Sequence, residues 1–131
     1  MQELAFPVQC DDDSLPKDSA LLQWSTLMLE ATTRIGQALD NPSNYEKWMK
    51  DTGFTNVQTT MYRWPGNPWP KKPADKELGL WVMVNLLDGL QGFTMALFTR
   101  VLGWSVEQVE LLLVDIRKDV QSKKIHTYWV M

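Results

Sequence analysis

The chain contains a single histidine, His126, so any acid–base step that requires an imidazole must use this side chain. It lies in the β-branched and aromatic stretch at the end of the chain, a composition typical of a β-strand. Because side chains alternate along a strand, His126 shares one face with Tyr128 and Val130. We treat His126 as a candidate catalytic residue, and the alternative is a histidine with only structural hydrogen bonds.

Asp88 and Arg100 are the only charged residues between Leu78 and Trp104, the most apolar part of the chain. Charged side chains are seldom buried unless they are paired or functional. The two could pair with each other across a helical hairpin. Equally, they could face a pocket and bind a carboxylate, a thioester or an enolate. Both are therefore candidate catalytic residues.

Tryptophan is the one unusual feature of the composition, with seven in 131 residues. Each is either a large core residue or part of the wall of a cavity for an apolar or conjugated ligand. Trp69 lies within a proline-rich loop, where we expect it to anchor the loop to the rest of the domain. The candidate substrate-binding residues are Tyr62, Arg63, Trp69, Trp81 and Tyr128.

The overall composition excludes several classes of function. A hydrophobic fraction of 44% and a charged fraction of 22% are typical of one soluble globular domain, residues 1–131. A net charge of −3 argues against nucleic-acid binding. Cys10 is the only cysteine, and no zinc pattern, phosphate loop or Ser–His–Asp spacing occurs, so we expect no metal and no cofactor. No apolar segment follows a basic start, which favours the cytoplasm.

Periodicity and capping residues predict three strands and about five helices. Ser19 or Asp18 caps the first helix, Gly53 ends the second, and Ser105 with Gln108 forms a capping box for the last. Pro7 places the first strand at a free edge or beside a bulge. The predicted strands are 3–8, 55–64 and 125–131, and the predicted helices begin near residues 19, 41, 75, 93 and 105.

The apolar stretch 78–104 is long enough to suggest a membrane span. Asn85, Asp88 and Gln91 would then lie in the middle of the bilayer, where the aspartate alone costs about 2.5–3.5 kcal/mol. Gly89 and Gly92 predict a break into two helices, roughly 75–90 and 93–102. We therefore expect two helices covered by protein and no membrane span.

Several short segments of the sequence resemble the C-terminal half of one family, the fungal LaeA-like methyltransferases. The segments are Asn67-Pro68-Trp69-Pro70, Lys76-Glu77-Leu78-Gly79-Leu80-Trp81, Leu97-Phe98-Thr99-Arg100-Val101-Leu102-Gly103-Trp104 and Ile125-His126-Thr127-Tyr128-Trp129. Those enzymes depend on S-adenosylmethionine, have the class I Rossmann-like fold and are tied to secondary metabolism. The resemblance covers essentially the whole chain.

The resemblance implies an α/β fold, a single truncated domain that corresponds to the substrate-side half. In class I methyltransferases the last strand runs antiparallel between the fifth and sixth, which would make residues 125–131 central, between 3–8 and 55–63. The family holds its cofactor on the first half of the sheet, with a glycine-rich turn and an acidic residue. No two glycines of this chain are separated by a single residue, and no cofactor-binding residue of the family has a counterpart.

Two classes of function fit these observations. The first is a cofactor-free polyketide cyclase, in which a retained acceptor pocket orients the substrate for lactone or pyrone closure. The second is a non-catalytic module that pairs with a full-length methyltransferase or a regulator. A fragment of a larger protein is a third possibility. Apolar surface once covered by the other half predicts a homodimer.

Overall fold

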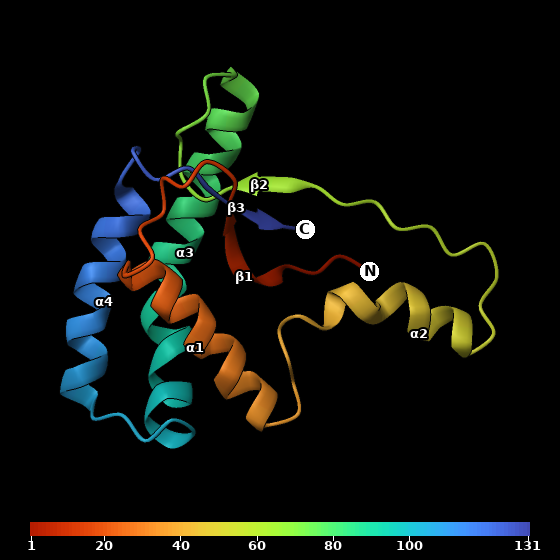
Figure 1. Ribbon diagram of the computed structural model, residues 1–131, viewed down its shortest axis with the longest axis horizontal. Helices are drawn as coiled ribbons and strands as arrows, with labels where there is room; N and C mark the ends of the chain where they lie inside the picture. Colours follow the sequence, from red (N-terminus) through yellow and green to blue (C-terminus); the bar gives the residue numbers. More distant parts are fainter.

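The computed structural model describes residues 1–131, and its core is a three-stranded sheet with helices packed on one side (Figure 1). The strands are β1 (Ala5–Cys10), β2 (Arg63–Pro65) and β3 (Thr127–Val130). The helices are α1 (Ala20–Arg34), a 3-10 turn (Asn41–Asn44), α2 (Tyr45–Asp51), α3 (Pro73–Arg100) and α4 (Val106–Gln121).

The strand order is β1-β3-β2, and β3 runs antiparallel to both neighbours. Trp64 of β2 lies opposite Trp129 of β3, and Gln9 of β1 lies opposite Tyr128. The pairing of β1 is irregular between Ala5 and Gln9, around Pro7, as expected for a strand whose proline cannot donate a hydrogen bond. This α/β architecture with a central antiparallel last strand confirms the expected fold class.

Local signals placed the ends of three helices correctly. Ser19 caps α1 by accepting a hydrogen bond from the Leu22 N–H, and Ser105 with Gln108 forms both bonds of a capping box on α4. Gly53 follows α2 with φ of +100°, a conformation that favours glycine. Among the helices and strands, α2 contacts only the 3-10 turn before it, and it projects away from the other helices (Figure 1).

The predicted break in the apolar stretch is wrong, because α3 is one continuous helix of 28 residues. A glycine in a helix costs about 1 kcal/mol, which tertiary packing can offset. Leu90, Thr94 and Phe98 are buried around the two glycines, and α3 packs against α1, α4 and β2. The chain therefore has four α-helices rather than about five.

The second strand is also shorter than predicted. Residues 55–62 are β-branched and aromatic, yet only Arg63–Pro65 form β2. Pairing is limited by β3, which has four residues, and the backbone bonds between Tyr62 and Met131 extend it by one pair. A composition that favours strands is insufficient without a neighbouring strand.

α3 is long and apolar enough to cross a membrane by length and composition alone, with a mean hydropathy of 1.3 over its most apolar window, of which 11% is buried. One such helix is weak evidence for a span. Its packing against α1, α4 and β2 places it in the body of the domain. No membrane span is clearly indicated.

The core joins the inner face of the sheet to α1, α3 and α4. Trp24 and Trp129 are its largest residues, and Phe6 contacts both rings at centroid distances of 5.7 and 4.8 Å. The other buried hydrophobic members of the cluster are Val8, Leu21, Met28, Leu90, Phe98, Val109, Leu112, Leu113, Ile116 and Val120. Trp48 and Trp81 are exposed, so the tryptophans divide among core, cavity wall and surface.

Candidate functional site

The two faces of the sheet carry different chemistry. Thr127 and Trp129 of β3 point into the core, whereas His126 and Tyr128 lie on the other face, as strand alternation requires. The neighbouring strand follows the same rule, because Trp64 lines an apolar cavity and Arg63 lines a polar cleft. These two hollows are the candidate sites.

The polar cleft has a volume of about 340 Å³ and contains four of the eight predicted site residues. Its wall combines residues from the turn after β1, from β2, from the proline-rich loop and from the start of α3. The lining residues are Asp11, Asp12, Arg63, Pro65, Trp69, Pro70, Asp75, His126 and Tyr128. His126, Arg63, Trp69 and Tyr128 are thus brought together in one cleft.

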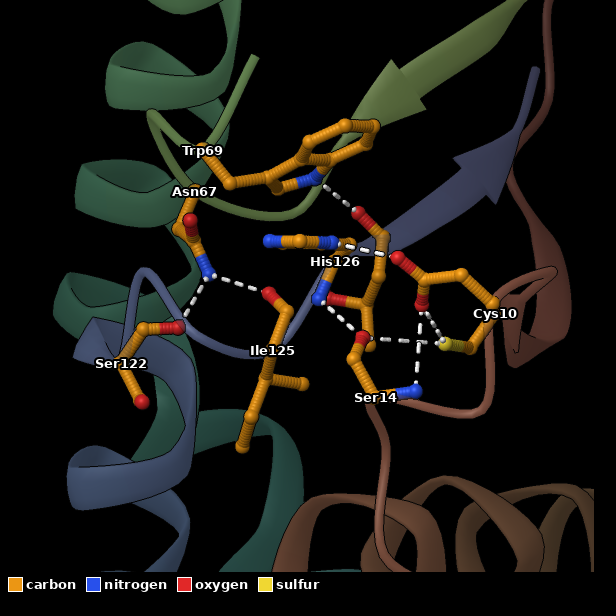
Figure 2. Close-up of polar contacts among 9 residues, drawn as sticks. Cys10, Ser14, Asn67, Trp69, Ser122, Ile125 and His126 are labelled. Atoms are coloured by element: carbon orange, nitrogen blue, oxygen red, sulfur yellow. Dashed lines mark hydrogen bonds and ion pairs between the residues drawn. The ribbon is translucent and has the colours of Figure 1, made fainter.

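His126 is held on three sides. Its Nδ1 lies 2.5 Å from Asp12 Oδ2, its backbone N–H donates to Ser14 Oγ at 2.7 Å, and its ring stacks on Trp69 with centroids 4.8 Å apart (Figure 2). The imidazole Nε2 has no partner in the chain. A carboxylate on one ring nitrogen with the other nitrogen free is the geometry of an oriented general base.

Asp12 is the centre of this arrangement. It also accepts hydrogen bonds from the Ser14 N–H at 3.1 Å and from the Cys10 thiol at 3.3 Å. The hydrogen bonds from Ser14 and then from His126 hold the pKa of the Asp12 carboxyl well below its usual range. Asp12 is therefore ionised throughout the physiological range.

A second polar group lies beside the first. Tyr128 donates to Asp11 Oδ1 at 2.8 Å, and Arg63 pairs with Asp11 Oδ2 at 2.5 Å. The hydrogen bond to Asp11, together with burial, raises the pKa of the Tyr128 hydroxyl. Arg63 also lies over the Tyr128 ring at 4.7 Å, so these three side chains are satisfied among themselves.

The proline-rich loop is fixed by two side chains. Trp69 donates its indole N–H to the Thr127 carbonyl at 2.8 Å, which confirms its expected role as an anchor. Asn67 is buried, and its amide nitrogen donates to the carbonyls of Ser122 and Ile125, both at 3.1 Å (Figure 2). These bonds hold the turn before β3 and thereby position His126.

The apolar cavity lies between α1, α3 and the inner face of the sheet, with a volume of about 470 Å³. Twelve of its fourteen lining residues are hydrophobic, and none has a charged side chain. They are Leu4, Phe6, Trp24, Met28, Thr32, Leu39, Trp64, Val82, Asn85, Leu86, Phe93, Leu97, Trp129 and Met131. The Thr32 hydroxyl donates to the carbonyls of Met28 and Leu29, so Asn85 supplies the free polar side chain at this cavity.

Four predicted site residues lie outside both hollows. Asp88 and Arg100 are exposed rather than buried, and no ion pair joins them. They occupy one helix, separated by about 18 Å at 1.5 Å per residue. Trp81 is 58% exposed on α3, and Tyr62 lines a separate groove of about 360 Å³ beside α2.

Sequence reasoning missed Asp11, Asp12, Ser14 and Asn67. Asp12 belongs to a run of three adjacent aspartates, and nothing local indicates that it reaches a residue 114 positions away. Asn67 belongs to one of the segments that carry the family resemblance, and this resemblance could have pointed to it.

The sheet order and the central antiparallel strand are those that the resemblance to class I methyltransferases implies. Comparison with known proteins gives the same answer. The chain is 40% identical over 129 residues to a probable methyltransferase, tdiE of Emericella nidulans, and 33% identical over 126 residues to the methyltransferase pytC of Aspergillus terreus. It is 32% identical over 127 residues to the secondary metabolism regulator LAE1 of Cochliobolus heterostrophus.

These matches cover 96–98% of this chain but only 39–41% of each relative. The chain therefore spans about two fifths of the length of the curated relatives it matches. No family model and no solved structure matches it. The chain is homologous to a part of the fungal LaeA-like methyltransferases, the group that includes regulators of secondary metabolism.

Proposed function

We propose that this chain forms the small-molecule-binding part of a methyltransferase-family protein in fungal secondary metabolism. The observation that carries the proposal is the apolar cavity, an uncharged hollow of about 470 Å³ walled by Trp24, Trp64 and Trp129. Ligand sites are commonly concave and mostly apolar, with volumes of about 300–1,000 Å³. Each 100 Å² of apolar surface that a ligand buries there contributes about 2.5 kcal/mol before the costs of association.

The proposal is tested with Nile red, a neutral conjugated dye, in a fluorescence titration. Val82 lines the cavity from α3, so Val82→Trp fills part of it. Val84 is on the same helix but does not line the cavity, and Val84→Trp is the matched control. We expect saturable binding of one dye per chain, weakened about tenfold or more by the first variant only, since the added indole occupies the ligand volume.

Two results would overturn this assignment. One is an absence of saturable binding to the unmutated chain. The other is an equal loss of affinity in both variants, which would assign the dye to the exposed apolar surface of α3. Circular dichroism of both variants establishes whether the helical content is retained.

The Asp12–His126 pair supports a second candidate, cofactor-free ring closure of a polyketide. His126 Nε2 would take the proton of a substrate hydroxyl or enol while the oxygen of that same substrate group attacks a thioester carbonyl. The new C–O bond closes the lactone or pyrone, the C–S bond breaks, and the thiolate takes the proton back from His126. The substrate would bind in the polar cleft, because His126 and the apolar cavity are on opposite faces of the sheet. Asp88 and Arg100 have no part in this candidate mechanism, because neither lines the cleft.

This second candidate is tested with the N-acetylcysteamine thioester of a triketide, whose closure to a pyrone releases a thiol. His126→Ala should lower the rate by about 10²–10⁴, the usual contribution of one acid–base group. Asp12→Asn should lower it less and alter the pH profile, since it disturbs the orientation of the imidazole. Thiol release no faster than in buffer, or full activity in His126→Ala, would remove the cyclase candidate and leave the binding function unaffected.

A further inference from the structure

The character of the apolar cavity specifies the charge of its ligand. No lysine, arginine, histidine, aspartate or glutamate lines it, and its only amide side chain is Asn85. An ion that enters such a hollow loses its hydration without gaining a counter-charge. The ligand of this cavity is therefore neutral.

The walls specify its shape. Trp24 and Trp129 meet edge to face at a centroid distance of 6.4 Å, and Phe6 packs at 4.8 Å from Trp129. Trp64 adds another ring from the neighbouring strand. Aromatic rings pack best against other planar groups in offset or edge-to-face contact. A planar conjugated molecule fits this wall better than a bulky aliphatic one.

Two indole N–H groups of the wall lack a partner in the chain, that of Trp64, which is half-buried, and that of Trp129, which is buried. The indole N–H of Trp24 donates to Thr94 Oγ1 at 2.8 Å, whereas the indole N–H of Trp129 donates to no atom of the chain, although Trp129 is 2% exposed. A buried tryptophan N–H usually has an acceptor. The indole nitrogen of Trp129 is not fully enclosed, because the one fully enclosed side-chain polar atom that lacks a partner is Asn67 Oδ1. Trp129 lines the apolar cavity and neither the polar cleft nor the groove beside α2.

We propose that the apolar cavity binds a neutral, planar conjugated ligand through an oxygen acceptor that receives the indole N–H of Trp129. This inference rests on the proposed binding function and specifies the ligand class. The acceptor is a carbonyl or hydroxyl oxygen on an aromatic or polyunsaturated ring system. Asn85 stands in the same wall and can bind a second polar group of the ligand.

The experiment compares 9-fluorenone with fluorene, two neutral planar molecules that differ only in the carbonyl group. We expect fluorenone to bind about 2- to 10-fold more tightly, the usual range for one neutral hydrogen bond. The anion fluorene-9-carboxylate should bind about tenfold or more weakly than fluorene, because the cavity offers no counter-charge.

Two variants assign the effect to one nitrogen. Trp129→Phe keeps an aromatic ring and removes the N–H, so it should abolish the preference for fluorenone. Trp24→Phe is the matched control, since the Trp24 N–H is already bonded to Thr94, and it should keep the preference. If Trp129→Phe does not fold, the indole N–H resonances of the unmutated protein replace it: that of Trp129 should shift further downfield with fluorenone than with fluorene, because only fluorenone offers a hydrogen-bond acceptor.

The outcomes separate this inference from the binding function. Equal binding of fluorenone and fluorene in the cavity would overturn the ligand class and leave the binding function standing. A preference for fluorenone over fluorene that persists in Trp129→Phe would also overturn the ligand class and leave the binding function standing. Failure of both compounds to bind would overturn the binding function itself.

Discussion

Asp12 is the residue whose ionisation couples most directly to the polar cleft. Its pKa in the folded chain is held well below the usual value by hydrogen bonds from Ser14 and His126. A carboxylate with a depressed pKa contributes stability above its unfolded pKa and loses it as the pH falls toward the folded pKa. The contribution is therefore full at pH 7 and declines below about pH 4, the ordinary range of an aspartate.

Asp12→Asn should remove this part of the acid sensitivity. Urea unfolding at several pH values should show the unmutated chain more stable than the variant at pH 7, with the difference shrinking below about pH 4. Asp13→Asn is the control, because Asp13 is exposed, makes no hydrogen bond and has a positive φ of 58° that asparagine tolerates. A difference that stays constant with pH would contradict this assignment.

Residue type predicted some side chains of the polar cleft but not their acidic partners. Residue type and the neighbouring sequence segments were sufficient to select His126, Arg63, Trp69 and Tyr128. Their acidic partners could not be selected in this way, because the pairing of Tyr128 with Asp11 spans 117 positions and depends on β1 lying next to β3. Residue type predicts the chemistry of a side chain, whereas its partner is set by the fold.

At the scale of elements, the packing of α3 depends on the close approach of Gly79 to the backbone of Asn67. A methyl group on Gly79 would lie 2.2 Å from the Asn67 carbonyl oxygen, a backbone atom that cannot move aside freely. Gly79→Ala should therefore destabilise the chain by about 1–3 kcal/mol, the usual cost of overpacking. Thermal unfolding followed by circular dichroism measures this cost.

Gly92 provides the control on the same helix. A methyl group there would meet no atom within 4 Å, so Gly92→Ala should stabilise the chain by up to about 1 kcal/mol through helix propensity. Equal effects of the two substitutions would show that the Gly79 contact with the Asn67 loop is absent in solution.

Elements were predictable where their signals are local. The capping box of Ser105 and Gln108 and the turn at Gly53 involve only neighbouring residues, and both are as expected. The continuity of α3 through Gly89 and the shortness of β2 were not predictable, because packing and strand pairing decide them. Propensity is a weak prior when tertiary contacts oppose it.

At the scale of the whole molecule, the relationship to methyltransferases raises the question of the cofactor. The glycines of this chain lack the close spacing of a nucleotide-binding turn, and no counterpart of the family's cofactor-binding residues occurs. We expect this 131-residue chain not to bind S-adenosylmethionine appreciably. Calorimetric titration that gives a micromolar dissociation constant would contradict this expectation.

The surface of α3 bears on assembly. Leu80, Trp81 and Phe93 are 43%, 58% and 54% exposed, an unusual amount of apolar surface for one helix. The edge of β1 is partly covered, because the Phe6 N–H donates to the Leu39 carbonyl, so helix packing is the favoured contact. We therefore propose a homodimer through α3, in place of strand pairing.

Light scattering tests this proposal. We expect about twice the 15.2 kDa mass of the chain at micromolar concentration, reduced toward one chain by Trp81→Glu. A mass near one chain in the unmutated protein would contradict the homodimer and favour the alternative, a module that pairs with a full-length methyltransferase or a regulator.

The central claim is that a neutral conjugated molecule binds in the apolar cavity, and the methionine methyl groups report on it most directly. Met28 lines this cavity and not the groove beside α2, Met131 lines both, and Met1, Met49 and Met61 line only the groove. With methyl-labelled methionine and 9-fluorenone, nuclear Overhauser effects from the ring protons should reach Met28, the methionine that lines the cavity alone. Contacts to the groove methionines instead, or to no methionine at saturating ligand, would contradict the account.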